Sequence, residues 1–250
     1  MLYIVGLGLF DAGDLSLRGV DAAKKCGRVY VEFYTNCFNG SLGELEGVLG
    51  RSVGVLDRRA LEEHPEENVL KGGDDVCLLV PGDPLVATTH SDLILRAGKL
   101  GIDVKVVHSS SVYSAIGETG LQLYKFGKTT TIAYKEGSYF PTSPYDVIDE
   151  NKCRGLHTLC LLDVKADVKR YMTVNEGLEL LLEMEKQKKK RVITEDTVCV
   201  GVARLGGDTI IKAGALRNLL KHDFGKPPHV LVIPGKLHFV EEEMLGLHKT

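Results

Sequence analysis

Residues 75–87 read DVCLLVPGDPLVA, and this stretch decides the fold class. It holds the most strand-like run in the chain, the apolar residues Val76 to Val80, which end on Pro81-Gly82-Asp83-Pro84. A short apolar run bounded by turn residues is typical of a strand buried on both faces of a parallel sheet. Gly82 permits a close backbone approach, and Asp83 places a carboxylate at the carboxyl end of the strand, where open α/β sheets bind ligands. A plain turn capped by Asp83 is the structural alternative.

Strand-like and helix-like segments alternate on both sides of this stretch, which is typical of parallel sheets covered by helices. Strands are predicted at 3–8, 28–34, 53–56, 104–108, 130–134, 157–164, 198–205, 209–213 and 229–233. Helices are predicted at 14–25, 42–49, 68–71, 93–100, 111–120, 146–152, 175–190 and 215–220. Asp14 and the Thr88 to Asp92 segment carry residues typical of helix N-caps. Gly206-Gly207-Asp208 predicts a hairpin, so the second half should hold antiparallel strands.

The chain has 250 residues, which allows one large α/β domain or two of ordinary size. The first series of strands and helices ends near residue 112 and a second begins after it. We therefore expect an N-terminal α/β domain at residues 1–112, with a mainly parallel sheet, and a C-terminal α/β domain at residues 113–250, with a mixed sheet.

Composition excludes several classes of protein. With 44% hydrophobic and 26% charged residues, the chain can form a packed core and is not disordered. The net charge of −3 provides no basic field for nucleic acid or anionic membrane. The apolar runs are shorter than the ~20 residues that span a bilayer, and no basic leader precedes Gly6. A cytoplasmic protein is expected.

The common motifs of catalysis fail on spacing or residue type. Gly6-Leu7-Gly8-Leu9-Phe10-Asp11 has aspartate where a dinucleotide fingerprint needs its third glycine. The chain has no P-loop, no histidine or cysteine pair at metal-ligand spacing and no nucleophile elbow, so we expect no metal and assign no catalytic residue. Such a chain suits chemistry carried by a reactive ligand that the protein orients. His229, after Pro227-Pro228, is interpreted either as a solvated turn residue or as a cleft residue.

Eight segments, in this order, carry a resemblance to a known family. They are MLYIVGLGL (1–9), RVYVEFYT (28–35), GDPLVATTHSDLILRA (82–97), GLQLYKFGKT (120–129), HTLCLLDVK (157–165), RYMTVNEG (170–177), TVCVGVARLG (197–206) and HVLVIPG (229–235). The chain resembles the diphthine synthases, a branch of the tetrapyrrole-methylase-like family of S-adenosylmethionine-dependent methyltransferases, over nearly its whole length.

The resemblance implies two α/β domains with S-adenosyl-L-methionine in the cleft between them, a homodimer, and a role in diphthamide biosynthesis. The implied reaction methylates the 3-amino-3-carboxypropyl-histidine of translation elongation factor 2, gives diphthine or its methyl ester, and releases S-adenosyl-L-homocysteine. The implied cofactor contacts are Leu9, Asp83, Val86, Ser111, Val112, Leu162, Val202 and His229.

Two residues depart from the pattern of the family. Phe10 stands where Gly-Leu-Gly-Leu-Gly-Asp is usual, and Val86 stands where glycine is usual. A β-branched residue tolerates a narrower range of backbone angles than glycine does. Two alternatives therefore stay open: a tetrapyrrole methyltransferase of the same fold, and a catalytically silent cofactor-binding scaffold.

Overall fold

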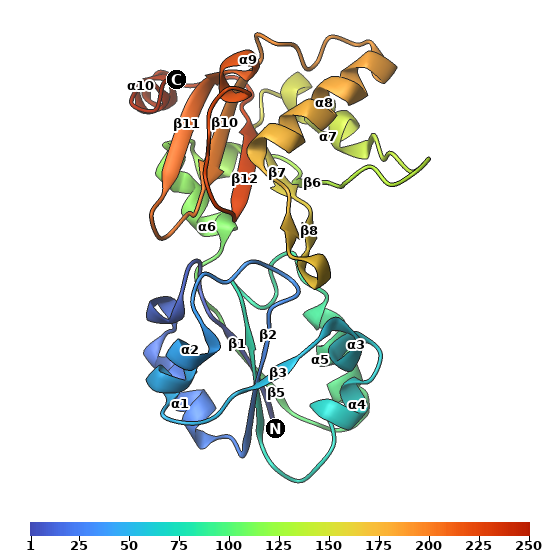
Figure 1. The fold of residues 1–250 in the computed structure, drawn as a ribbon, viewed down its shortest axis with the longest axis vertical. Helices are drawn as coiled ribbons and strands as arrows, with labels where there is room; N and C mark the ends of the chain where they lie inside the picture. Colours follow the sequence, from blue (N-terminus) through green and yellow to red (C-terminus); the bar gives the residue numbers. More distant parts are fainter. The chain divides into compact units, whose positions relative to one another are not determined.

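The computed structural model describes residues 1–250 apart from the side chain of Asp167. The chain forms two compact units (Figure 1). The first unit holds Met1–Ala115 with Ala166–Val168, and the second holds Ile116–Lys165 with Lys169–Thr250. Within the described residues, no helix combines the length and the apolar character needed to cross a membrane.

The first unit is built on a five-stranded sheet of order β3-β2-β4-β1-β5. All its strand pairs are parallel, in agreement with the predicted mainly parallel sheet. Its strands are β1 (Leu2–Gly6), β2 (Arg28–Glu32), β3 (Gly54–Leu56), β4 (Val76–Val80) and β5 (Val104–Val107). Its helices are η1 (Ala12–Asp14), α1 (Leu17–Lys25), α2 (Leu42–Leu49), α3 (Arg58–Glu62), α4 (Pro65–Asn68), α5 (His90–Lys99), α6 (Val112–Ala115) and η4 (Ala166–Val168).

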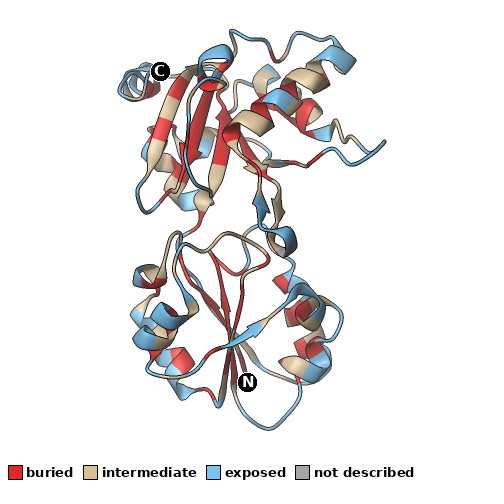
Figure 2. Cartoon of the chain, viewed as in Figure 1, coloured by how far each residue is buried: buried red, intermediate tan, exposed pale blue. Residues whose placement is uncertain are grey.

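Strand β4 lies at the centre of this sheet and is buried along its whole length (Figure 2). Successive side chains of a strand point to opposite faces, and β4 follows that rule. Cys77 and Leu79 pack in a cluster with residues of α1 and α2, whereas Leu78 and Val80 pack in a second cluster with residues of α3 and α5. Helices therefore cover both faces, which explains why β4 is apolar throughout.

Three helix predictions in the first unit needed correction. The helix expected at 14–25 begins at Leu17, because the N–H of Gly19 donates to the Ser16 hydroxyl and Ser16, not Asp14, is the N-cap. The helix expected at 68–71 is absent. Its place is taken by α3 and α4, which end at Asn68, because Asp57 caps α3 and Pro65 begins α4. Helix α5 begins at His90, before the predicted start.

The second unit is built on a mixed sheet, as predicted, and its strand order is β11-β10-β12-β7-β6. Its strands are β6 (Thr130–Ile132), β7 (Thr158–Leu162), β10 (Val198–Ala203), β11 (Ile210–Ala215) and β12 (His229–Ile233), with a separate ribbon of β8 (Val164–Lys165) and β9 (Arg170–Tyr171). Its helices are η2 (Ile116–Thr119), η3 (Leu123–Lys125), α7 (Ser143–Cys153), α8 (Val174–Lys188), α9 (Leu216–Leu219) and α10 (Phe239–Gly246). The predicted hairpin is the antiparallel pair β10 and β11.

A buried carboxylate ties the last helix to the second unit. Glu241 of α10 is fully buried, and it accepts hydrogen bonds from Lys125, from the ring of His157 (3.0 Å) and from the backbone amides of Gln122 (2.9 Å) and His238 (2.8 Å). Burial alone would raise the pKa of Glu241, but the Lys125 ammonium and the other donors outweigh it and lower the pKa to about 2. The ionised form is therefore stable in the fold.

The carboxyl ends of β1 and β4 approach so closely that side chains do not fit between them. A Cβ on Gly6 would lie 2.6 Å from the carbonyl oxygen of Gly82 and 2.7 Å from the Cβ of Ser109. Beyond the strands, the N–H of Gly82 donates to the carbonyl of Gly8 (2.8 Å), and the N–H of Gly8 donates back to Gly82 (3.2 Å). Gly8 and Gly82 both have positive φ, at 86° and 74°, which glycine adopts without strain.

Replacing Glu241 by glutamine should lower the free energy of unfolding by about 2–4 kcal/mol at pH 7, because Lys125 and His157 lose their charged partner. Glu241 has a lowered pKa in the fold, so its contribution is present above its unfolded pKa and is lost as the pH falls toward 2. Urea unfolding should show the two proteins converging between about pH 4.5 and pH 2. Glu243→Gln, an exposed site on the same helix, is the control. An equal effect of both variants would contradict the assignment.

Gly6→Ala should destabilise the first unit by roughly 1–3 kcal/mol, because the added methyl meets backbone that cannot withdraw. The matched control is Gly47→Ala in α2, where an added Cβ meets nothing within 4 Å. That change should raise stability by about 0.5–1 kcal/mol, since alanine is the better helix former. Chemical denaturation of both variants measures the difference, and similar stabilities would show that the strands have room to separate.

Candidate functional site: the carboxyl edge of the first sheet

Three loops meet at one edge of the first sheet. Strand β1 pairs in parallel with β4 on one side and with β5 on the other, so the carboxyl ends of all three strands lie together. The loops that leave them are residues 7–11, 81–89 and 108–111. This edge of an open α/β sheet is the usual place for a ligand.

Asp83 is the buried polar group of this edge, with an exposed fraction of 6%. One carboxylate oxygen accepts the N–H of Leu85 (3.0 Å). The other oxygen lies 2.8 Å from Nδ1 of His108 and accepts the N–H of Ser109 (3.2 Å). The carboxylate thereby joins the loop after β4 to the loop after β5, and it is held in one orientation.

Asp14 fixes the loop after β1. One of its carboxylate oxygens accepts the N–H of Phe10 (2.7 Å) and the N–H of Leu9 (3.1 Å). The sequence interpretation of Asp14 as a helix cap missed this role, and the only available signal was an aspartate a few residues beyond a glycine-rich turn. Leu9 is held half-buried at the edge.

The two departures from the pattern of the family cause no backbone strain. Neither Phe10 nor Val86 has a positive φ, and the residue with left-handed backbone in the second loop is Ala87, at φ 55°. The valine that stands in place of glycine at position 86 therefore changes the half-buried side-chain surface of the loop and leaves the path of its backbone unchanged.

Ser111 and Val112 lie where the third loop enters α6. Ser111 is buried, and its carbonyl accepts the N–H groups of Ser114 (3.1 Å) and Ala115 (3.0 Å), which begins the helix. The five expected contacts of the first unit, Leu9, Asp83, Val86, Ser111 and Val112, thus all lie in or directly after the three loops of one edge.

The three expected contacts of the second unit also lie together. Strand β12 runs antiparallel to β7 and β10, so its start lies beside their ends. In the register, His229 is opposite Ala203, next to Val202, and Val230 is opposite Leu161, next to Leu162. Leu162 and Val202 are buried, whereas His229 is half-buried.

His229 has a clear structural task. Its Nδ1 accepts the N–H of Val174 (3.2 Å) at the start of α8, so its Nε2 carries the proton and donates to the carbonyl of Lys226 (3.1 Å). Burial lowers the pKa of His229, which keeps the ring neutral. Of the two interpretations left open by the sequence, the structure shows a half-buried residue that positions a helix start.

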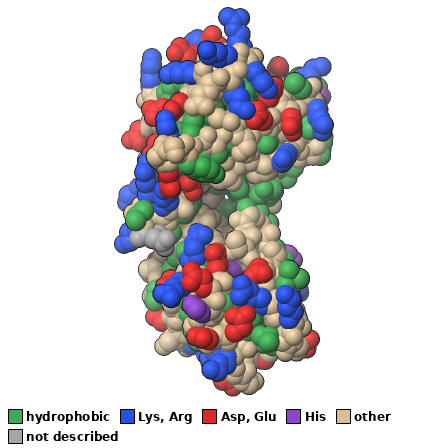
Figure 3. All heavy atoms as spheres, turned by 90° about the vertical axis from the view of Figure 1, so that its right-hand side faces the viewer, with side chains coloured by type: hydrophobic (Ala, Val, Ile, Leu, Met, Phe, Trp, Pro, Cys, Tyr) green, Lys and Arg blue, Asp and Glu red, His purple; other side chains and the backbone are tan. Residues whose placement is uncertain are grey.

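The edge of the first sheet suits the binding of a small reactive ligand. It presents backbone groups made accessible by glycine, one buried carboxylate and several apolar side chains. Within the part of the chain that the structure describes, no cluster of three or more His, Cys, Asp or Glu could hold a metal ion. Acidic and basic side chains are interspersed on the viewed face of each unit (Figure 3).

Sequence reasoning missed a second polar cluster in the first unit. Glu32 and His90 are both buried, with exposed fractions of 0% and 3%, and His90 Nε2 lies 3.9 Å from a carboxylate oxygen of Glu32. The sequence suggested helix-cap chemistry for His90, but its ring nitrogens bond to no backbone amide. The available signal was a histidine directly after the Asp83 loop.

Comparisons with known proteins agree with this geometry. Residues 1–218 match the family of Tetrapyrrole (Corrin/Porphyrin) Methylases. The chain is 50% identical to the diphthine synthase of Methanocaldococcus jannaschii, over 98% of this chain and 97% of that protein. It is 48% identical to the diphthine synthase of Methanococcus maripaludis, with the same coverage.

Solved structures give the same result. A crystal structure of a diphthine synthase is 38% identical, has a TM-score of 0.90, and covers 99% of this chain and 95% of that one. A protein from Entamoeba histolytica assigned to the diphthine synthases is 41% identical, with a TM-score of 0.91 and coverage of 100% and 98%. The chain belongs to the tetrapyrrole methylase family and, within it, to the methyltransferases of the diphthine synthase family.

Proposed function

We propose that this methyltransferase uses S-adenosyl-L-methionine to methylate the 3-amino-3-carboxypropyl-histidine of translation elongation factor 2 in diphthamide biosynthesis. The observation that carries the proposal is the match of 50% identity to a diphthine synthase over 98% of the chain. The product is diphthine or its methyl ester, and S-adenosyl-L-homocysteine is released.

The carboxyl edge of the first sheet fits this cofactor. A methyl donor of this kind carries an ammonium group and ribose hydroxyls, for which a buried carboxylate such as Asp83 is a suitable acceptor. An added Cβ at Gly82 would meet nothing within 4 Å, so the backbone there is open to the close approach of a ligand. We propose that Leu9, Asp83, Val86, Ser111 and Val112 contact the cofactor in the first unit, and Leu162, Val202 and His229 in the second.

The bound cofactor supplies an electrophilic methyl group, and the chain supplies orientation. In-line attack by a neutral amine needs the two reactants held in one geometry, an effect worth up to ~7–11 kcal/mol in well-oriented systems. Asp83 is suited to such positioning because its carboxylate is fixed by donors from two loops. No residue is assigned as the base, since an open site can release the proton to water.

We further propose that the protein works in the cytoplasm as a homodimer, as the resemblance implies. Sedimentation equilibrium of the purified chain tests the second point, and a monomer at micromolar concentration would contradict it.

Asp83→Asn should weaken binding of S-adenosyl-L-methionine at least tenfold, because a charged acceptor is replaced by a neutral amide. Isothermal titration calorimetry measures the change. Asp21→Asn is the matched control, because Asp21 is exposed on α1 and lies outside the three loops of this edge. Absence of binding by the unaltered protein would contradict both the diphthine synthase and the tetrapyrrole methyltransferase assignments.

Incubation with elongation factor 2 that carries the aminocarboxypropyl-histidine should add methyl groups to that peptide, detected by mass spectrometry. Three increments of one methyl mass indicate diphthine, and four indicate the methyl ester. A tetrapyrrole substrate is the control, since the family includes tetrapyrrole methylases. The proposal would be overturned if the tetrapyrrole were methylated while the elongation factor 2 peptide stayed unmodified.

A further inference from the structure

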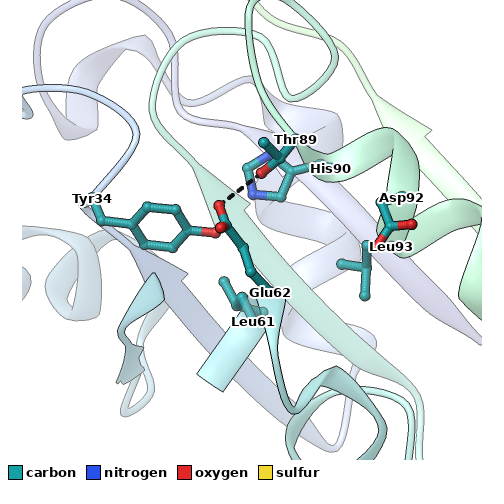
Figure 4. A pocket seen from close by; sticks show the side chains of 7 residues that line it. All are labelled: Tyr34, Leu61, Glu62, Thr89, His90, Asp92 and Leu93. Carbon is teal, nitrogen blue, oxygen red and sulfur yellow. Dashed lines mark hydrogen bonds between the residues drawn. The ribbon is translucent and has the colours of Figure 1, made fainter. Parts of the chain in front are cut away.

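The first unit contains a cavity of about 240 Å³ between α3, the start of α5 and the segment that follows β2 (Figure 4). Its lining residues are Tyr34, Leu61, Glu62, Thr89, His90, Asp92 and Leu93. This volume lies below the ~300–1,000 Å³ of pockets for drug-sized ligands, so it suits a small head group. We call it the Tyr34 pocket.

Two buried side chains of the Tyr34 pocket have unused hydrogen-bonding groups. Tyr34 and His90 have exposed fractions of 5% and 3%. The Tyr34 hydroxyl and both ring nitrogens of His90 have no hydrogen-bond partner among the described residues. Buried polar groups are nearly always hydrogen-bonded, because a buried donor or acceptor without a partner destabilises the fold. Together with a cavity beside them, these groups indicate a ligand.

The two groups are neutral hydrogen-bonding partners. Burial lowers the pKa of His90 to about 4, so the ring is uncharged near neutral pH and offers one donor and one acceptor. Burial, with the charges of Glu32 and Glu62, raises the pKa of Tyr34, so its hydroxyl keeps its proton. The Tyr34 and His90 side chains therefore make the inner part of the pocket polar but uncharged.

The charges around the Tyr34 pocket favour a cation. Figure 4 shows the Tyr34 hydroxyl, the Glu62 carboxylate and the His90 ring converging from three segments. Glu62 has an exposed fraction of 31%, accepts a hydrogen bond from the Thr89 hydroxyl (3.0 Å) and forms an exposed ion pair with Arg58 (3.8 Å), whose guanidinium lies over the Tyr34 ring, 5.0 Å from its centroid. Asp92 at the rim is paired with Arg96 (2.7 Å).

Glu32 lies behind the lining of the pocket, 3.9 Å from His90 Nε2. It is fully buried, and its carboxylate accepts hydrogen bonds from the backbone of Tyr34 (2.9 Å) and Thr35 (3.0 Å). The described residues place no Lys or Arg within 4.0 Å of it, and burial raises the pKa of its carboxyl group. An incoming anion would meet the carboxylates of Glu62 and Asp92, whereas an ammonium group would gain attraction from Glu62.

We propose that the Tyr34 pocket binds a side-chain ammonium group of the methyl-acceptor protein, apart from the amine that receives the methyl group, with Glu62 paired to that ammonium and Tyr34 and His90 bonded to the neighbouring polar atoms. The assignment of the ligand to the acceptor rests on the proposed function. The segment from Asp83 to His90 joins the candidate cofactor edge to this pocket, so one loop would serve both reactants. These residues position the acceptor and are not assigned to the chemical step.

Titration with tetramethylammonium chloride, followed by NMR of the ¹⁵N-labelled His90 ring, tests binding in the intact protein. The ring resonances should shift with saturable, millimolar affinity, and Glu62→Gln should weaken binding at least tenfold. Glu63→Gln is the matched control, because Glu63 follows on the same helix, is exposed and does not line the pocket. Its affinity should stay within twofold. Equal affinities of the two variants, or shifts with sodium acetate instead, would overturn the proposal.

Steady-state kinetics separate this proposal from the proposed function. With modified elongation factor 2, Glu62→Gln should raise KM for the acceptor at least tenfold and leave both kcat and the Kd for S-adenosyl-L-methionine within about twofold. Tyr34→Phe should raise KM several-fold in the same way. An unchanged KM in both variants refutes the pocket while methyl transfer stands. If the unaltered protein methylates no elongation factor 2 but binds tetramethylammonium through Glu62, the proposed function fails and the cation site is supported.

Discussion

The close approach of β1 and β4 at their carboxyl ends is the constraint on which the first unit depends. Gly6 faces the carbonyl of Gly82 at a distance that excludes any side chain, and Gly8 and Gly82 exchange two backbone hydrogen bonds beyond the strands. The chain can turn there only because both glycines adopt positive φ. The loop that begins at this contact carries Asp83 first and His90 seven positions later. The contact between the two strand ends therefore positions both the candidate cofactor edge and the Tyr34 pocket.

Three histidines with pKa values lowered by burial show how the structure separates support from function. His157 accepts the N–H of Gly235 (3.0 Å) and donates to Glu241, and His229 bonds to Val174 and Lys226. Both rings use each nitrogen to hold a backbone segment or a helix in place. His90 is about as buried as His157, but among the described residues neither of its ring nitrogens has a hydrogen-bond partner. This contrast, rather than burial itself, is what distinguishes the Tyr34 pocket from the structural polar networks.

Membership of the diphthine synthase family agrees with a site built for orientation. The candidate edge offers a fixed carboxylate, backbone groups and apolar surface, which is what a bound methyl donor requires from a protein. Phe10 and Val86 are compatible with this design because the left-handed position of the loop falls on Ala87. The departures from the glycine pattern therefore alter side-chain surface and leave the path of the backbone intact.

The sequence by itself determined the class of the fold, because apolar runs such as 76–80 must be covered on both faces and turn residues mark where each strand ends. It also determined the hairpin at 206–208 and the family. Only the tertiary structure decided the surroundings of His90 and the task of Glu241, because the Tyr34 pocket and the partners of Glu241 are supplied by distant segments, whereas Asp14 and Glu32 bond to residues within five positions. The helices at 58–68 were missed for a related reason. Short charged helices have weak periodicity, and their caps and packing against the sheet decide them.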